Sequence, residues 1–198
     1  MRVTTDGREV VTGAGGESTT GVPASPVMHF RNGAVAISSL ATLLLQLVDD
    51  NRVSLDDKHS AWLPSIPNAD RVTHGQLARM TSGYRHYLIG NDAFIENQLT
   101  DPFRQITTQE KLSYANLHEL LYEPRANSNY AHTNYVLLGL ALERITGQSL
   151  PALIQDRIYA PLSLHNTGAY SNAAASIFHA IGAHLVPDEP LPLRLPKP

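Results

Sequence analysis

A run of leucines between residues 36 and 50 constrains the fold of this chain more than any other feature of its sequence. Leu40, Leu43, Leu44 and Leu47 recur at the interval of an α-helix, so they share one face. A helix with such a stripe packs its apolar face against a core. The sequence therefore predicts a buried helix from about residue 36 to residue 50, preceded by the glycine-punctuated stretch MHFRNG.

Capping signals and periodicity predict further helices. Thr73 begins a capping-box pattern, and its helix is expected to stop at Gly83 in a left-handed cap. A helix is also predicted over about residues 108–121. The stretch HTNYVLLGLALERITG, residues 132–147, has one apolar face and a glycine where a C-terminal cap belongs. Ser149 is expected to cap one more helix, LPALIQDRIYAPL.

Strands are predicted only near the N-terminus. The segment VTTDGREVVTGAG, residues 3–15, is typical of a hairpin about Asp6-Gly7, and a loop is expected after it. A lone two-stranded hairpin is marginal in water, so the chain is short of strands. The predicted fold class is α+β and mainly helical, with residues 1–170 as one partial domain and residues 171–198 as an extended, Ala- and Pro-rich tail.

Composition excludes several classes of function. The net charge is only -3, which gives no electrostatic case for binding nucleic acid or an anionic membrane. The absence of cysteine excludes disulfides and thiolate chemistry, and the nine histidines show no zinc-binding spacing, so no metal or other cofactor is predicted. The longest apolar run is too short to span a membrane and no signal-peptide pattern is present; the compartment stays unknown, and it would be the cytoplasm if the chain is expressed as given.

The order of segments resembles the serine β-lactamase-like hydrolases, which include class C β-lactamases, D-alanyl-D-alanine carboxypeptidases, D-aminopeptidases and esterases. FRNGAVAIS, MTSGY and NYVLLGLALERITGQSL carry the resemblance, which covers residues 5–168. It implies the mainly helical domain of the β-lactamase/transpeptidase-like fold, truncated, with most of the C-terminal sheet missing. The third motif of the family, K-T-G or H-x-G, is not found before Pro198. A second chain completing the sheet stays open.

The first motif of the family, S-x-x-K, is degenerate in this sequence. In such enzymes the serine attacks a carbonyl, and the lysine one turn later lies beside it. Aligned on F-R-x-G, the two positions are Ala34 and Ile37, so the resemblance implies that acyl transfer is impaired. Ser38, one turn below Ala34, has no lysine three residues after it and is expected to be buried away from substrate.

The second motif, Y-x-N, reads Tyr130-Ala131-His132. The phenol that can act as a base is kept as a vestige, while His132 replaces the amide; a histidine there could bind substrate or act as a base, although a structural role is favoured. Tyr114-Ala115-Asn116 also fits Y-x-N, but it lies inside a predicted helix. Arg125 stands before the motif where the family usually has glycine.

Three functions stay open at this point. The chain could be a hydrolase that uses His132, Tyr130 or an unexpected serine. It could be a non-catalytic relative that binds a small molecule, a peptide or a cell-wall fragment in the old cleft, lined by Arg31, Tyr84, Tyr130 and His132. It could also be a decayed fragment without activity. Ser82 of MTSGY is expected to cap the backbone rather than to react.

Overall fold

The computed structural model describes residues 1–19, 21–28, 33–101, 104–165 and 167–168 of the chain, which divides into two compact units at residue 31. Arg31 and the predicted tail over residues 171–198 therefore lie outside the described residues. Within the described part, no helix combines the length and the apolar character needed to cross a membrane.

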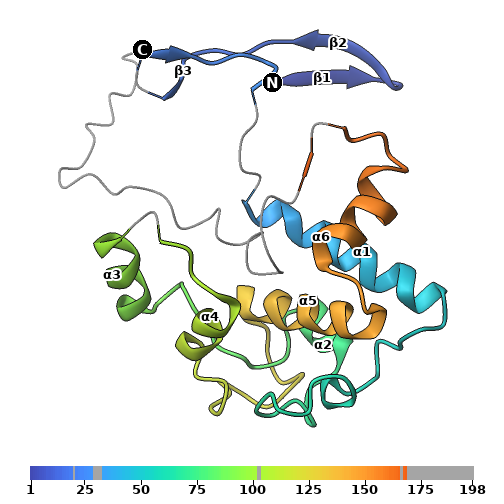
Figure 1. Cartoon of the computed structure of the whole chain (residues 1–198), viewed down its shortest axis with the longest axis vertical. Helices are drawn as coiled ribbons and strands as arrows, with labels where there is room; N and C mark the ends of the chain where they lie inside the picture. Colours follow the sequence, from blue (N-terminus) through green and yellow to red (C-terminus); the bar gives the residue numbers. More distant parts are fainter. Residues whose placement is uncertain (20, 29–32, 102–103, 166, 169–198) are drawn as a thin grey trace. The chain divides into compact units, whose positions relative to one another are not determined.

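The N-terminal unit consists of two small antiparallel ribbons (Figure 1). The first confirms the predicted hairpin, since Asp6 and Gly7 adopt the left-handed φ values of 50° and 75° that a tight hairpin turn requires. The second was predicted as a loop, and its strands are only two and three residues long. The four strands are β1 (Arg2–Thr5), β2 (Arg8–Thr12), β3 (Glu17–Thr19) and β4 (Val22–Pro23).

The second unit is helical. Its centre is α5, which packs against α1, α2, α4 and α6 and is buried along most of its length. The α-helices are α1 (Ala36–Asp49), α2 (His74–Ala78), α3 (Asp92–Thr100), α4 (Thr108–Tyr114), α5 (His132–Thr146) and α6 (Leu150–Ile154). Shorter helical turns are η1 (Gly33–Val35), η2 (His59–Ala61) and the π-helical η3 (Gln155–Tyr159). Together with the ribbons, this confirms the predicted α+β class.

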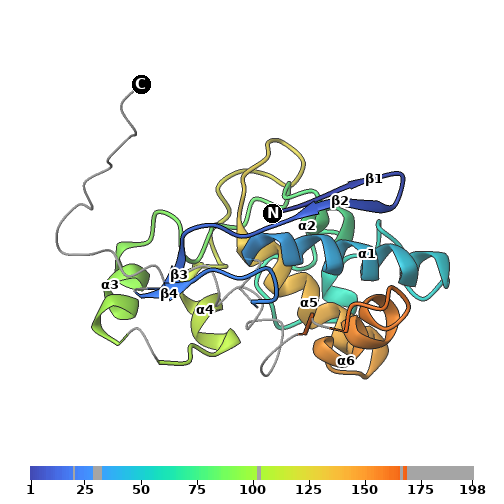
Figure 2. The same cartoon turned by 90° about the horizontal axis from the view of Figure 1, so that it is seen from above.

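The leucine stripe of α1 behaves as its spacing predicts. Leu40, Leu43, Leu44 and Leu47 are each 1% exposed or less and belong to the same core as α5. The helices α1 and α5 run in the same direction, so their N-terminal ends lie at the same end of the helical unit (Figures 1 and 2). The two family motifs that begin these helices therefore share one region of the fold.

Several helix ends differ from the sequence expectations. The helix after Thr73 keeps its predicted capping box but ends at Ala78, because Met80 turns the chain with a left-handed φ of 57°. The helix predicted over residues 108–121 ends at Tyr114, where Asn116 has a φ of 43°. The helix of residues 132–146 ends as predicted, with Gly147 at a φ of 73°. Short left-handed turns, rather than long helices, thus position the loops near α5.

Gly83 does not cap a helix, but its position still requires a glycine. Its φ is 88°, and a Cβ atom there would lie 2.3 Å from the carbonyl oxygen of Tyr122. Ser149 also departs from expectation, since it precedes α6 but its hydroxyl makes no capping hydrogen bond, and the helix continues as the π-helical turn η3.

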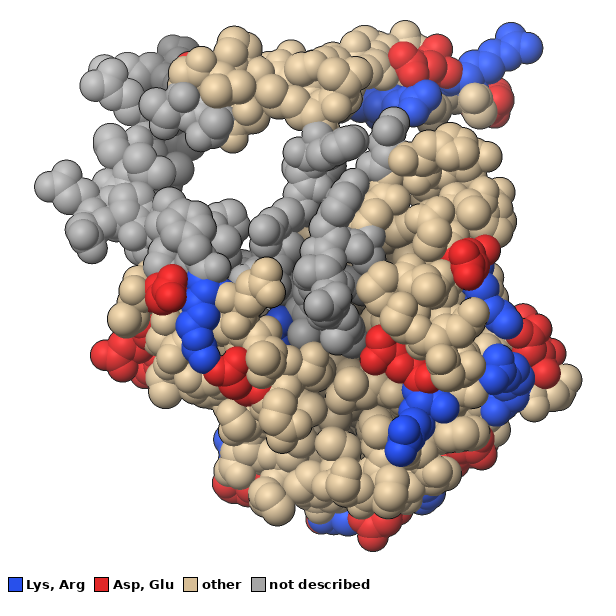
Figure 3. Space-filling model, viewed as in Figure 1, with Lys and Arg blue, Asp and Glu red and all other residues tan. Residues whose placement is uncertain are grey.

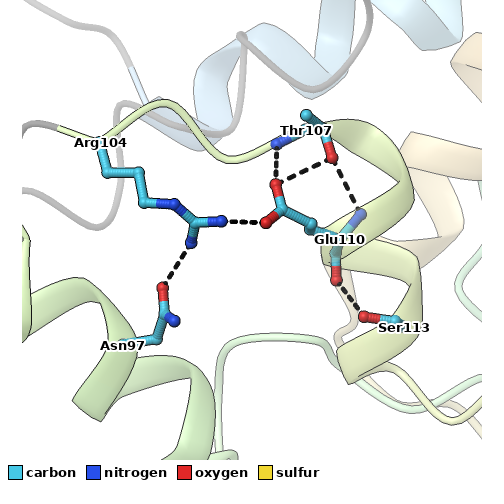
Figure 4. A network of polar contacts seen from close by, with 5 residues as sticks. All are labelled: Asn97, Arg104, Thr107, Glu110 and Ser113. Atoms are coloured by element: carbon cyan, nitrogen blue, oxygen red, sulfur yellow. Dashed lines mark hydrogen bonds and ion pairs between the residues drawn. The ribbon is translucent and has the colours of Figure 1, made fainter.

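The helix α3 was not predicted, and a polar network ties it to α4 (Figure 4). Thr107 and Glu110 form a capping box, in which Glu110 accepts from the backbone nitrogen of Thr107 at 2.9 Å and Thr107 Oγ1 accepts from that of Glu110 at 3.2 Å. Arg104 pairs with the Glu110 carboxylate and donates to Asn97 Oδ1 of α3 at 2.8 Å. The hydrogen bonds from Thr107, together with Arg104, lower the pKa of Glu110.

Candidate functional site

The start of α1 carries hydrocarbon at both positions where the resemblance implies catalytic groups. Ala34 lies in the turn η1 and Ile37 in the first turn of α1. Both are half-buried, and Ile37 packs against the core. Neither of these two side chains can attack a carbonyl or accept a proton.

Ser38 is the nearest hydroxyl along α1, and its expected burial is wrong. The residue is exposed, because the stripe that faces the core begins elsewhere on the helix, at Ala36 and Leu40. Its hydroxyl donates to the carbonyl oxygen of Val35 at 2.7 Å, a local bond of the kind that serines make inside helices. Ser38 is therefore open to solvent, with its hydroxyl hydrogen directed at the backbone.

Tyr130 and His132 form a hydrogen-bonded pair at the start of α5. The phenol oxygen of Tyr130 lies 2.8 Å from Nε2 of His132. His132 is 2% exposed as the first residue of α5, whereas Tyr130, two residues earlier, is 50% exposed. Burial lowers the pKa of His132 to about 4, so its imidazole is neutral at neutral pH. The second motif thus presents an accessible phenol on a buried neutral imidazole.

A second histidine, His86, lies against this pair. Its ring centroid is 4.5 Å from that of His132 and 6.3 Å from that of Tyr130. Its Nδ1 accepts hydrogen bonds from the backbone nitrogens of Leu88 at 2.9 Å and Ile89 at 3.1 Å. Burial, with the neighbouring His132, lowers the pKa of His86 to about 3. The ring is therefore neutral, with its proton on Nε2.

Sequence reasoning did not select His86 as a site residue. It lies 46 positions before His132 in the printed sequence, and no motif or periodicity links the two residues. The only local signal was its closeness to Tyr84 and Tyr87 in the chain, which does not indicate a contact with α5. The contact arises from the fold and could not be predicted without it.

The loop MTSGY is hydrogen-bonded to the start of α5 through Ser82. The Ser82 hydroxyl donates to Oδ1 of Asn134 at 2.5 Å and accepts from the backbone nitrogen of Tyr84 at 3.1 Å. Asn134 in turn donates to the carbonyl oxygen of Ala131 at 3.0 Å. Ser82 is fully buried, and the hydrogen bond that it accepts from the Tyr84 backbone nitrogen confirms its expected role in capping the backbone.

Tyr84 and Tyr114, two other tyrosines considered from the sequence, have recognisable contacts of their own. Tyr84 is 1% exposed, and its hydroxyl donates to the carbonyl oxygen of Pro67 at 2.6 Å; burial raises its pKa. Tyr114 ends α4 and packs edge-on against Phe94, with ring centroids 5.2 Å apart. The alternative Y-x-N pattern over residues 114–116 is thus part of the α3–α4 region.

Metal binding finds no support in this cluster. Across the described ranges, no group of three or more His, Cys, Asp or Glu side chains is arranged to hold a metal ion. A metal on Nε2 of His86 would also have to displace the proton that its backbone contacts place there. On the face drawn in Figure 3, acidic and basic side chains of the helical unit are interspersed.

A helical unit centred on the NYVLLG helix, with F-R-x-G before α1 and a tyrosine motif before α5, defines the class of serine β-lactamase-like proteins. The comparison with known families agrees: the chain belongs to the Beta-lactamase family, whose model matches residues 1–197.

Individual relatives give the same picture. The chain is 31% identical to penicillin-binding protein 4 of Amycolatopsis lactamdurans over 75% of its own length and 38% of that protein. It is 32% identical to a D-stereospecific amidohydrolase from Streptomyces sp., with a TM-score of 0.64 over 69% of this chain and 43% of the other. A penicillin-binding protein from Bacillus halodurans shares the fold, with a TM-score of 0.72 at 20% identity over 86% of this chain and 53% of the other. The chain thus spans about two fifths of the first two relatives.

Proposed function

We propose that this chain does not form the serine-linked acyl intermediate of its family and that it acts as a binding protein for a peptide or a cell-wall fragment. The observation that carries the proposal is the pair Ala34 and Ile37 at the start of α1, where the family's chemistry requires a hydroxyl and an amine. Loss of a nucleophile alone costs roughly a million-fold in rate in a serine protease.

The nearby serines support this proposal because their hydroxyls are engaged elsewhere. Ser82 is fully buried between Asn134 and the backbone nitrogen of Tyr84. Ser38 is exposed, but its hydroxyl donates to Val35, and no lysine follows it one turn later. A serine activated by a neighbouring base needs that base within hydrogen-bond distance, and the recorded bonds of these two serines lead to other groups.

The ligand class follows from the relatives and from the polar pair that is kept. One relative is named a penicillin-binding protein and one a D-stereospecific amidohydrolase. Tyr130 offers a half-exposed phenol oxygen that can accept a hydrogen bond from a ligand N–H group, since its own proton is directed at Nε2 of His132. Peptides ending in D-amino acids and β-lactams are therefore the ligands to test first.

The test is calorimetric titration of the purified chain with a D-Ala-D-Ala peptide, its L,L stereoisomer and a β-lactam. We expect saturable heat with the D,D peptide, weaker heat with the L,L peptide, and a loss of affinity in Tyr130→Phe. Labelling with a fluorescent penicillin, analysed on a denaturing gel, is expected to give no serine adduct. Absence of heat with every ligand, or a penicillin adduct on a serine, would contradict the proposal.

A further inference from the structure

Tyr130 differs from the other described tyrosines in its surroundings. Tyr84 and Tyr135 donate their hydroxyls to the carbonyl oxygens of Pro67 and Ala78 in the interior of the helical unit. Among the described tyrosines, Tyr130 alone is exposed, and its hydroxyl faces a ring nitrogen rather than a carbonyl oxygen. It therefore combines access to solvent with a neighbouring base.

The direction of this hydrogen bond follows from acidity. A phenol is a much stronger acid than the N–H of a neutral imidazole, so Tyr130 donates and Nε2 of His132 accepts. His132 is held by the first turn of α5 and is nearly fully buried. Because burial lowers its pKa to about 4, the ring stays unprotonated at neutral pH and can accept a proton.

The 2.8 Å separation lies within the reach at which a general base removes a proton from a nucleophile. The His86 ring lies beside that of His132, at a centroid distance of 4.5 Å and an interplanar angle of 55°, and its bonds to Leu88 and Ile89 keep it from turning. This packing limits the freedom of the His132 ring, so that Nε2 stays directed at the phenol. The Tyr130 phenol oxygen, the His132 base and the His86 ring are thus already in position before any reagent binds.

We propose that Tyr130 is a site of covalent acylation by small activated aryl esters, with His132 as the general base. The phenol oxygen forms a bond to the acyl carbon, and the bond from that carbon to the aryloxide leaving group breaks. The aryloxide departs with the bonding electron pair, while the phenol proton moves to Nε2 of His132 and then to solvent. The product is one acyl group on Tyr130 for each chain.

This reaction does not rest on the binding function proposed above, since it needs neither a peptide ligand nor the start of α1. General-base assistance contributes typically 10²–10⁴-fold in rate, and the weakly basic His132 belongs at or below the low end of that range. We therefore expect Tyr130 to react about tenfold faster than a tyrosine of equal exposure without a base.

The test uses p-nitrophenyl acetate, with the acetylated positions followed by peptide mapping and mass spectrometry. Leu45→Tyr supplies an internal reference, because Leu45 lies on α1 and is 52% exposed, against 50% for Tyr130. Peptide mapping also separates acetylated tyrosine from acetylated amines. We expect Tyr130 to be acetylated about tenfold faster than the introduced tyrosine in the same molecule.

His132→Asn separates the base from mere exposure. This substitution should lower the acetylation rate of Tyr130 to that of the reference tyrosine, while the reference itself stays unchanged. Equal rates at the two tyrosines when His132 is present, or an unchanged Tyr130 rate in His132→Asn, would overturn the proposal. If circular dichroism shows that His132→Asn does not fold, the comparison of the two tyrosines within Leu45→Tyr decides alone.

Discussion

The hydroxyl of Ser82 donates a 2.5 Å hydrogen bond to Oδ1 of Asn134, and both residues are buried. This bond joins the loop after α2 to the first turn of α5, where His132 begins the helix. Since Asn134 also donates to the carbonyl oxygen of Ala131, one chain of bonds fixes the segment that presents Tyr130 and His132. The two most specific family segments, MTSGY and NYVLLG, are thus held together by their own side chains.

Ser82→Ala is expected to destabilise the helical unit by about 1–3 kcal/mol, because it removes a partner of Asn134 and of the Tyr84 backbone nitrogen in the interior. Urea denaturation followed by circular dichroism measures the change. Ser113→Ala is the matched control, since that hydroxyl is exposed and donates to the carbonyl oxygen of Glu110. The control should change stability by no more than about 0.5 kcal/mol, and equal losses in both variants would contradict the assignment.

Arg125 holds a left-handed conformation in the loop before Tyr130. Its φ is 78°, and its backbone nitrogen donates to the carbonyl oxygen of Thr81 at 2.9 Å. A residue with a Cβ atom is destabilised by about 1–2 kcal/mol in this conformation relative to glycine. Glycine loses more conformational freedom on folding, which offsets about 0.5–1 kcal/mol of that difference. The family resemblance places glycine at this position, so the arginine is a local cost.

Arg125→Gly is therefore expected to stabilise the chain by about 0.5–1 kcal/mol, measured as a rise in the thermal midpoint or in the urea midpoint. Arg125→Ala is the control: it removes the same charged side chain but keeps the Cβ atom, so no gain is expected. A similar gain in both variants would show that the side chain, rather than the backbone conformation, is the cause.

Ala34→Ser alone is expected to leave the chain unable to hydrolyse a chromogenic β-lactam. The new hydroxyl would have Ile37 one turn later, and an isoleucine cannot accept its proton. The double variant Ala34→Ser with Ile37→Lys is the comparison. A covalent β-lactam adduct on the introduced serine, formed only in the double variant, would identify the missing base as the cause. Hydrolysis by the single variant would contradict this account of the site.

The parts of the fold that local signals encode could be predicted from the sequence. The leucine stripe of α1, the hairpin turn at Asp6-Gly7, the capping box at Thr73 and the Gly147 cap each depend on residues a few positions apart. All four are present in the structure. Each of these four features is stabilised by interactions among neighbouring residues, so tertiary contacts did not alter it.

The parts that depend on contacts between distant segments could not be predicted. The helix α3 has a weak apolar pattern and is fixed by its Asn91 cap and by Arg104, which also binds α4. The ends of α2 and α4 are set by left-handed residues, Met80 and Asn116, of types that do not require that conformation. The packing of His86 on His132 likewise joins two segments that no sequence pattern connects.

A second pair of histidines also meets through a contact that the sequence does not predict, and this pair affects stability. His59 and His74 are fully buried, with ring centroids 5.5 Å apart in an edge-to-face arrangement. None of their ring nitrogens has a hydrogen-bond partner among the described residues. Burial, with a contribution from His74, lowers the pKa of His59 to about 3, and burial lowers that of His74 against an opposing effect of Asp57.

These lowered pKa values predict that the chain loses stability in mild acid. An unfolded histidine has a pKa of about 6.5, so below that pH the unfolded state binds a proton that the folded state does not. The stability present above pH 6.5 should therefore fall by up to about 1.4 kcal/mol per pH unit for each such histidine. For His59 the fall continues toward its folded-state pKa of about 3.

Urea midpoints between pH 7.5 and pH 5 measure this fall in a range where most carboxylates stay ionised. The double variant His59→Leu with His74→Leu should show a shallower dependence on pH, because two proton-binding sites leave the unfolded state. Some dependence should persist, since His86 and His132 also have lowered pKa values. An unchanged slope in the double variant would show that the buried pair does not set the acid sensitivity.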